Sequence, residues 1–333
     1  MRDQLLLVKT ALPKKPLTPV LSNILLKGGI LTATDSELTI SAKVDSDLEI
    51  LLPPKTPEVI SALDGEITMA LDGQSLHIST ERGQGNYKLA TDSGIDDYPE
   101  PDHVSELHPL PSSFVSAVQS VVVATSLDQA RPAFCGVLVE ITDGNLTLTA
   151  SDTYRLARAK MSITHPDIKV LVPGRILREL VRIKPDNLKM GITESVITFG
   201  FGESKMSSRL LEEKYPNVDG VLPKEPQTVI KMSFETLAET VKRASLLAEG
   251  KNKVVGLNVE DNLTVNVTGQ EGSMEEVLPI EKTGENISLF VNSSYLAEGL
   301  KGEGEIQFHG ESGPMMLSRE NYLYLLLPVK KVN

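Results

Sequence analysis

The side chains that most often carry out chemistry in proteins are few in this sequence and lie far apart. None of the histidines stands at the spacing of a metal-ligand motif with another histidine or with Cys135, the single cysteine. The five are His77, His103, His108, His165 and His309. Cys135 follows Phe134 in an expected strand, which favours a small buried residue over a nucleophile. We therefore expect no catalytic residue, no bound metal and no cofactor.

Two short stretches could suggest other chemistry. The stretch GFGESK at 200–205 contains Gly-x-Gly but lacks the remaining residues of either phosphate-binding motif. The acidic pair Asp96 and Asp97 in GIDDYPEPD could suggest a metal site, although a solvated turn explains it better. An enzyme built on repeated α+β units is accordingly the least favoured of the functions considered.

One stretch points instead to contact with an apolar partner. In ASDTYRLARAK (150–160), Tyr154, Arg155 and Leu156 directly follow a turn-like Ser-Asp-Thr. Three consecutive residues of a strand cannot all face the core, because side chains alternate between its two faces. Either Arg155 is a solvated neighbour of two packed residues, or the three line a surface that an apolar group visits.

Composition narrows the class of protein. A chain of 333 residues is too long for one ordinary core and suggests two or three domains. A net charge of −12 at pH 7 argues against a protein that binds nucleic acid with its whole surface, but allows a local basic patch. Aromatic residues make up 4% of the chain and tryptophan is absent, which argues against base-stacking platforms. One cysteine, and no apolar stretch long enough to span a bilayer, predict a cytoplasmic protein without membrane contact.

The elements that must position these residues recur three times along the chain. Alternating apolar and polar residues predict a hairpin at 28–44, 144–161 and 261–277, each preceded by a helix. A second block follows each hairpin, with a short apolar strand, one amphipathic helix and a further hairpin. The copies of this second block are 48–80, 168–200 and 287–318. The period is roughly 110–120 residues, within the usual size range of a domain.

We interpret the chain as an α+β protein of three repeated domains, 1–106, 107–225 and 226–333, the first of them shortened at its N-terminus. Each domain is expected to hold two helices and mostly antiparallel strands, so that the helices cover one face of a sheet. The boundaries fall in two proline-rich joints, YPEPDHVSELHPLPSS and YPNVDGVLPKEPQ.

Four motifs in register resemble those of the bacterial DNA sliding clamp family, the beta subunit of DNA polymerase III. TLTASDTYRLA resembles the family's Thr-Asp-x-x-Arg-Leu-Ala segment, and SSRLLEEKYPNVDGVLP (207–223) resembles its strand and interdomain link. LFVNSSYLAEGL (289–300) is similar to a helix start of the family, and YLYLLLPVK (322–330) to its C-terminal strand. The resemblance covers almost the whole chain.

The resemblance implies a clamp fold in which two chains join head to tail and close a ring, with helices lining the hole and sheets outside. Such a homodimer would encircle duplex DNA without sequence specificity and act as a processivity factor. The further partners implied are the clamp loader, and the DNA polymerases and repair proteins that carry a short clamp-binding peptide ending in Leu or Phe. The location implied is the nucleoid of a bacterial cytoplasm.

Basic residues on the helices are consistent with a ring that holds DNA by its phosphates. In GRILRELVRIK, Arg175, Arg178 and Arg182 share one helix face at spacings of three and four. Including positions where the family touches the DNA backbone, the implied DNA-binding residues are Lys15, Arg175, Arg178, Arg182, Asn292 and Tyr295. The alternatives are an ordinary solvated helix face and, for Tyr295, a place in the core.

The same resemblance assigns the Tyr-Arg-Leu stretch to a hydrophobic pocket that receives the partner peptide. The implied pocket residues are Arg131, Phe134, Ser151, Thr153, Tyr154, Arg155, Leu156, Pro216, Val221, Ser312, Pro314, Leu325, Leu327, Pro328 and Val329. Arg155 and Arg131 are expected to hydrogen-bond the peptide backbone while their stems cover apolar surface. The alternative is a cluster that packs domains together and binds nothing.

The resemblance also implies a subunit contact. Leu246 and Leu247 would contribute from the third domain, and Tyr87 from an edge strand of the first. Because the first domain lacks the family's first strand, this contact is where the chain departs most from the family. The main alternative to a clamp is a three-repeat adaptor that binds proteins but does not encircle DNA.

Overall fold

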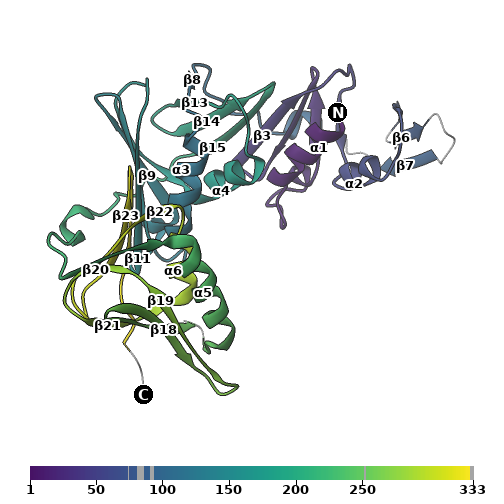
Figure 1. Ribbon diagram of the computed structural model, residues 1–333. Coiled ribbons are helices and arrows are strands. Elements are labelled where there is room, and N and C mark those ends of the chain that lie inside the picture. The colour runs from purple at the N-terminus through teal and green to yellow at the C-terminus, as the bar shows by residue number, and fades with distance from the viewer. Residues whose placement is uncertain (74, 81–85, 91–93, 251–252, 331–333) are drawn as a thin grey trace. The chain divides into compact units, whose positions relative to one another are not determined.

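The computed structural model describes residues 1–333 except 74, 81–85, 91–93, 251–252 and 331–333. The chain divides into two compact units, Met1–Ser112 with Pro185–Leu210 and Ser113–Lys184 with Leu211–Asn333 (Figure 1). These units combine segments that are distant in sequence, because strands of one repeat pair with strands of the next. The domain limits inferred from the sequence therefore stay a prediction, and each unit is described by itself.

The first unit contains a sheet of eight strands in the order β4-β1-β2-β3-β15-β14-β13-β8 and a separate sheet in the order β5-β6-β7. Every pairing in both sheets is antiparallel. Its elements are α1 (Arg2–Val8), β1 (Ile24–Lys27), β2 (Ile30–Thr34), β3 (Leu38–Lys43), β4 (Ile50–Leu52), α2 (Thr56–Ser61), β5 (Ile67–Asp72), β6 (Ser75–Thr80), β7 (Asn86–Ala90), β8 (His108–Pro109), β13 (Lys189–Ile192), β14 (Val196–Phe201) and β15 (Ser204–Arg209).

The second unit contains a sheet of nine strands in the order β12-β9-β10-β11-β24-β23-β22-β16-β20 and one of four in the order β19-β18-β17-β21. Its helices are α3 (Phe114–Val121), α4 (Gly174–Ile183), α5 (Phe234–Leu247) and α6 (Ser293–Gly299). Its strands are β9 (Gly136–Thr142), β10 (Asn145–Ser151), β11 (Arg155–Ser162), β12 (Ile168–Pro173), β16 (Thr228–Ser233), β17 (Val254–Val259), β18 (Asn262–Thr268), β19 (Ser273–Pro279), β20 (Glu281–Gly284), β21 (Ile287–Asn292), β22 (Glu303–Phe308), β23 (Met315–Arg319) and β24 (Tyr322–Leu326).

The threefold repeat expected from the sequence is confirmed by the order of elements. A helix, a run of strands, a second helix and three more strands occur three times, beginning at α1, α3 and α5. The two helices of each repeat pack together, α1 with α2, α3 with α4 and α5 with α6. Strand β8 precedes α3 and β16 precedes α5, whereas α1 begins at Arg2 with no strand before it among the described residues.

Two of the repeats share an identical hairpin turn, which explains the common Ala-[Thr/Ser]-Asp-[Ser/Thr] string. Asp152 accepts hydrogen bonds from the backbone N–H groups of the residues two and three positions later, and Asp35 does the same in the first repeat. Thr153 and Ser36 both have a φ of 79°, a left-handed conformation that is uncommon outside glycine. An aspartate that caps its own turn stabilises this geometry, so the turn is encoded locally.

Helix α5 illustrates how the helices cover the sheets. Leu237, Val241 and Ala244 lie at spacings of four and three, are buried, and face the sheet formed by β17, β18 and β19. The Ser233 side chain accepts a hydrogen bond from the Thr236 N–H and caps the helix start, a contact typically worth about 1 kcal/mol. Figure 1 shows α5 and α6 side by side against this sheet. Within the described part of the chain, no helix has the length and apolar character needed to cross a bilayer.

Candidate functional site

An apolar cavity of about 300 Å³ lies in the second unit, where the start of β11 meets the end of β24. The turn between β10 and β11, the residues after β24, and the segment following Tyr215 all contribute to its walls. The lining residues are Phe134, Ser151, Thr153, Tyr154, Arg155, Leu156, Pro216, Asn217, Val218, Val221, Leu325 and Leu327. Four segments that are far apart in sequence, Phe134 included, therefore form one apolar depression.

Strand pairing determines which apolar side chains meet in this cavity. Leu156 of β11 is paired with Leu325 of β24, and both are almost fully buried. The Leu327 N–H donates to the Tyr154 carbonyl oxygen at 2.9 Å, which extends the pairing beyond the end of β24. Tyr154, Val221 and Leu327 are 57%, 61% and 41% exposed. Buried leucines therefore lie beside exposed apolar side chains, an arrangement that can bury an apolar anchor of a partner.

The segment after β15 is held against the cavity by aromatic and aliphatic packing. Tyr215 is buried in a cluster with Leu138 and Leu171, against which Val218 also packs. The ring of Phe134 contacts the Tyr215 ring edge-on, with 6.0 Å between the ring centres. Such a ring pair typically contributes about 1 kcal/mol beyond its buried area. Pro216, Asn217 and Val218 are thereby fixed as one wall before any partner binds.

Arg155 differs from the expectation that it hydrogen-bonds the peptide backbone. Its side chain is 8% exposed, and its guanidinium donates to Asp152, Glu298, the Tyr324 hydroxyl and the Val123 carbonyl oxygen. These acceptors lie mostly in segments distant from the Tyr-Arg-Leu stretch and use most of its donors within the protein, so hydrogen bonds from Arg155 to a peptide backbone stay a prediction. Arg155 instead connects the cavity wall to the short helical turn Val122–Ala124 that follows α3, and to α6.

The charge of Arg155 is maintained despite its burial. Burial alone would lower the pKa of Arg155, but Tyr324, Glu298 and Asp152 together raise it well above its ordinary value. The guanidinium also lies over the Tyr295 ring, 4.0 Å from its centre, in a cation–π contact. A paired and hydrogen-bonded cation of this kind makes the adjacent backbone of Tyr154 and Leu156 rigid.

Some residues expected in the pocket lie elsewhere. Arg131 does not line the cavity but adjoins it, because its guanidinium donates to the Thr153 hydroxyl at 3.1 Å. Ser312 and Pro314 lie in the loop between β22 and β23, and the Val329 N–H donates to the carbonyl oxygen of Phe290 in β21. The expected residues absent from the cavity lining are Arg131, Ser312, Pro314, Pro328 and Val329. Asn217 and Val218 were missed, although they directly follow Pro216.

The basic face expected on α4 is only partly available. Arg175 and Arg182 are exposed, but Arg182 forms an ion pair with Glu179 at 2.7 Å. Arg178 is half-buried and donates to the Thr125 hydroxyl, and burial lowers its pKa. The three arginines do lie on one helix, as their spacing predicted. The Arg178 side chain, however, faces the segment around Thr125 rather than solvent and supports the fold.

Two other residues expected to contact DNA have structural partners. Asn292 is buried, and its side chain accepts the Tyr295 N–H at 3.1 Å as the N-terminal cap of α6. Tyr295 is half-buried beneath the Arg155 guanidinium. For Asn292 the expected DNA contact conflicts with this burial, because its oxygen already serves the helix start. Lys15 is exposed in the bend between residues 11 and 19 of the first unit.

The residues expected at a subunit contact lie at exposed edges. Tyr87 is exposed on β7, an outer strand of the three-stranded sheet in the first unit. Leu246 is 78% exposed near the end of α5 in the second unit, and Leu247 is half-buried beside it. Val277 is also exposed, on the outer strand β19. A lone exposed leucine is ordinary, but Tyr87 and Val277 lie on strands whose outer edges have no partner among the described residues, and Leu246 is on α5, which packs against β19.

The structure gives the surroundings of the residues considered for catalysis. Cys135 was expected to be buried in a strand, but it is half-buried at the end of a short helix, Pro132–Cys135, and burial raises the pKa of its thiol. Asp96 and Asp97 are exposed in a turn, which confirms the solvated-turn interpretation. Among the described residues, no three His, Cys, Asp or Glu side chains are grouped so that they could hold a metal ion.

Comparison with known proteins agrees with this architecture. Residues 110–217 match the family model for the central domain of the DNA polymerase III beta subunit, and 219–325 match that for its C-terminal domain. The chain is 30% identical to a beta sliding clamp of Staphylococcus epidermidis over 339 residues, covering 90% of this chain and 88% of the relative. It is 28% identical to a beta sliding clamp of Synechococcus elongatus, covering 99% and 97%.

Comparison with solved structures leads to the same family. The crystal structure of the Bacillus subtilis DNA polymerase sliding clamp superimposes with a TM-score of 0.90 at 24% identity, covering 99% of this chain and 97% of that one. The matched family models, the threefold order of elements and the identity to curated clamps all point to one family. This chain belongs to the family of bacterial beta sliding clamps, the beta subunits of DNA polymerase III.

Proposed function

We propose that this chain is a processivity factor, a sliding clamp that closes as a head-to-tail homodimer around duplex DNA and tethers DNA polymerases. Membership of the beta sliding clamp family supports this activity. The further partners proposed are the clamp loader, and polymerases and repair proteins whose short peptide ends in Leu or Phe. The cavity between Leu156 and Leu327 is the proposed peptide site, and no catalytic step is assigned to the chain.

The observation that carries the homodimer is the pattern of strand pairing between repeats. Strand β3 of the first repeat pairs with β15 of the second, and β11 of the second pairs with β24 of the third. By position in the repeat, β19 corresponds to β3 and β11, and β7 corresponds to β15 and β24. Among the described residues, β19 pairs only with β18, and β7 only with β6. Strands β19 and β7 are thus each available for one further pairing of the same kind.

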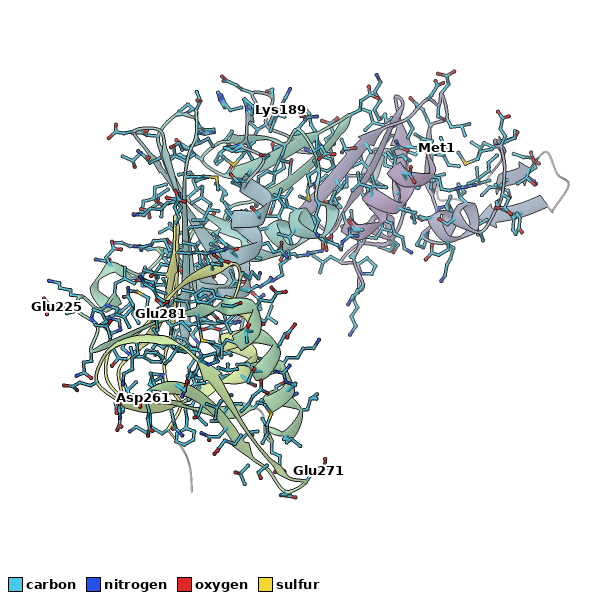
Figure 2. The ribbon with its side chains drawn as sticks, viewed as in Figure 1. Met1, Lys189, Glu225, Asp261, Glu271 and Glu281 are labelled. Carbon is cyan, nitrogen blue, oxygen red and sulfur yellow. The ribbon has the colours of Figure 1, made fainter. Side chains whose placement is uncertain are left out.

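A second copy of the chain supplies the partner for each unpaired strand. If β19 of one copy pairs with β7 of the other, the chain is extended head to tail, and two such contacts close the assembly. Tyr87 on β7 and Val277 on β19 would then be covered, with Leu246 nearby on α5. Glu271, at the tip of the β18–β19 hairpin, marks this edge in Figure 2. Covering exposed strand edges also removes a route to aggregation.

Contact with DNA is proposed to occur through phosphates and without base recognition. Lys15, Arg175 and Lys242 are exposed cations on or beside helices. A few such contacts give weak binding that falls with salt, which suits a protein that must slide. The chain's overall negative charge would keep DNA from binding to the remaining surface.

One observation favours the alternative of an adaptor that does not encircle DNA. Several cations near the helices are neutralised by carboxylates, in the ion pairs Lys9–Glu58, Arg182–Glu179 and Arg243–Glu276. An adaptor would still use the cavity but would not require a closed dimer.

An experiment that compares retention on circular and linear DNA distinguishes the clamp from the adaptor. A clamp loaded on nicked circular duplex should remain bound through gel filtration and be lost after the circle is linearised. Equal retention on both forms would exclude encirclement. Mass measurement in solution should give about twice 36.2 kDa, whereas a strict monomer would favour the adaptor.

A further inference from the structure

A second cavity, of about 510 Å³, lies in the second unit beside α3 and is distinct from the proposed peptide site. Its walls come from α3, from the end of β11, and from the turn between β23 and β24. The residues whose side chains decide its chemistry are Ser116, Ser120, Lys160, Lys301, Arg319 and Glu320. We propose that this cavity binds a phosphoryl group, either of a nucleic acid backbone or of a free phosphorylated molecule.

The charge of the cavity is opposite to that of the chain. The chain has 45 acidic and 33 basic residues, yet this cavity contains three cations and one carboxylate. In the part of the chain that the structure describes, no carboxylate lies within ion-pair distance of Lys160, Lys301 or Arg319. An unneutralised cationic group of this kind attracts a compact anion.

Two of the cations are held close together by neutral partners. Arg319 donates to the Ser120 hydroxyl at 3.3 Å, and its guanidinium lies over the Tyr322 ring at 4.5 Å. The Lys301 ammonium is 3.5 Å from the Gln119 carbonyl oxygen. Burial lowers the pKa of Lys301 and the nearby Arg319 lowers it further, while the Glu298 carboxylate acts in the opposite direction. These contacts position the cations without cancelling their charge, so an anion in the cavity would relieve their repulsion.

The polar lining matches the hydrogen-bonding needs of phosphate. A phosphoryl group offers three acceptor oxygens, and arginine, lysine and serine hydroxyls are its common donors. Lys160 is exposed at the cavity and able to reorient toward a ligand. Ser116 is also exposed, but its hydroxyl donates to the Ser113 carbonyl oxygen at 2.7 Å and would have to turn from it to reach a ligand. Glu320 is the one feature that opposes an anion.

Calorimetric titration of the full-length protein with pyrophosphate at low ionic strength tests the site. We expect saturable binding that weakens by about 10-fold in Lys301→Met, as for loss of one charged hydrogen bond, and by a smaller factor in Lys160→Met. Glu320→Gln should tighten binding, because it removes the opposing carboxylate. The matched control is Lys169→Met, which removes the same charge from β12 outside the cavity.

The possible results of this titration distinguish a phosphate site from nonspecific attraction of an anion. Absence of saturable pyrophosphate binding, or equal affinity in Lys301→Met and Lys169→Met, would overturn the proposal. Because Lys160 is exposed, Lys160→Met keeps the test valid if the half-buried Lys301 variant folds poorly.

A parallel titration with a linear duplex of about 20 base pairs identifies the source of the phosphate. If Lys301→Met weakens duplex binding more than Lys169→Met does, the ligand is nucleic acid; if only pyrophosphate binding falls, it is a free phosphorylated molecule. Neither titration requires a closed ring, so this result is independent of retention on circular DNA.

Discussion

The joint between β3 and β15 in the first unit and the joint between β11 and β24 in the second share a backbone plan but differ in chemistry. Both begin with the same aspartate-capped turn, and each carries a cavity beside it. In the second unit Leu156 is paired with Leu325, whereas the corresponding pair in the first unit is Thr39 with Ser207. The repeated backbone thus provides two similar positions, and the side chains make only one of them apolar.

The cavity at the first-unit joint is smaller and polar. It encloses about 200 Å³ and is lined by Thr34, Ser36, Glu37, Thr39, Pro99, Glu100, Asp102, Val196, Ser207, Ser208 and Arg209. Its turn presents Glu37 where the second unit presents Tyr154, and carboxylates of the following segment add further negative charge. An apolar peptide anchor would have to desolvate these groups without pairing them, which is unfavourable. The comparison therefore predicts no second peptide site at the joint between β3 and β15.

The largest effect is expected at Arg155, whose place in the first unit is taken by the buried Leu38. Arg155→Met should lower the free energy of unfolding by about 3 kcal/mol, because Asp152 remains 10% exposed and loses its partner. Leu38→Met, the matched variant, should cost less than about 1.5 kcal/mol. Thermal unfolding of both variants measures the difference. Equal losses would show that the charged network does not distinguish the two joints.

The next largest effect concerns peptide affinity. Leu327→Ser should weaken binding of a fluorescent peptide ending in Leu-Phe by roughly 30-fold, since it removes an exposed apolar contact at the cavity, worth about 2 kcal/mol. Arg209→Ser, at the corresponding position at the end of β15, should leave the affinity unchanged. Anisotropy titrations check both, with dimer mass as the test of intact assembly. Unchanged affinity in Leu327→Ser would mean that the cavity is not the peptide site.

Acid should affect the first joint more than the second. His103 is hydrogen-bonded to Ser41 and Ser207, and burial lowers its pKa to about 4. Because the unfolded histidine binds a proton more readily, stability is full above the ordinary pKa of about 6.5 and falls as the pH drops toward 4. After allowing for partial exposure, the loss is about 2 kcal/mol.

A His103→Gln variant tests this pH dependence. It retains hydrogen-bonding capacity without a titrating ring, so the wild-type protein should lose more stability than the variant between pH 7 and pH 4.5, measured by thermal unfolding. Parallel pH profiles for the two proteins would show that His103 does not contribute.

The smallest effect is expected from an attempt to build a second peptide site. Glu37→Tyr combined with Thr39→Leu places the side chains of the second-unit cavity in the first. We expect weak additional binding, with a Kd of about 1 mM, because the Leu325 equivalent and the Arg155 network are still missing. Titration followed by NMR would detect it. A second site as tight as the first would show that two wall residues suffice.

The sequence predicted the repeat, most strands and most of the side chains that line the cavity proposed to bind a peptide. These features follow from alternation along strands, from helical spacing, and from the Asp35 and Asp152 turns, all of which depend on neighbours in the chain. Partners of the predicted polar residues were not predictable in the same way. Arg178 was placed on a basic helix face and Asn292 at a family position for DNA contact, yet their side chains bond to Thr125 and to the start of α6.

The limit of prediction has a physical reason. A hairpin turn is decided over about five residues by backbone geometry and local hydrogen bonds, so the sequence determines it directly. The environment of Arg155 is decided by Val123, Glu298 and Tyr324, which strand pairing brings together from separate repeats. By itself the sequence therefore determined three similar modules and the apolar character of one joint. Only the tertiary structure decided which cations are neutralised and which remain available to a ligand, because burial and hydrogen bonding depend on segments that meet only in the folded chain.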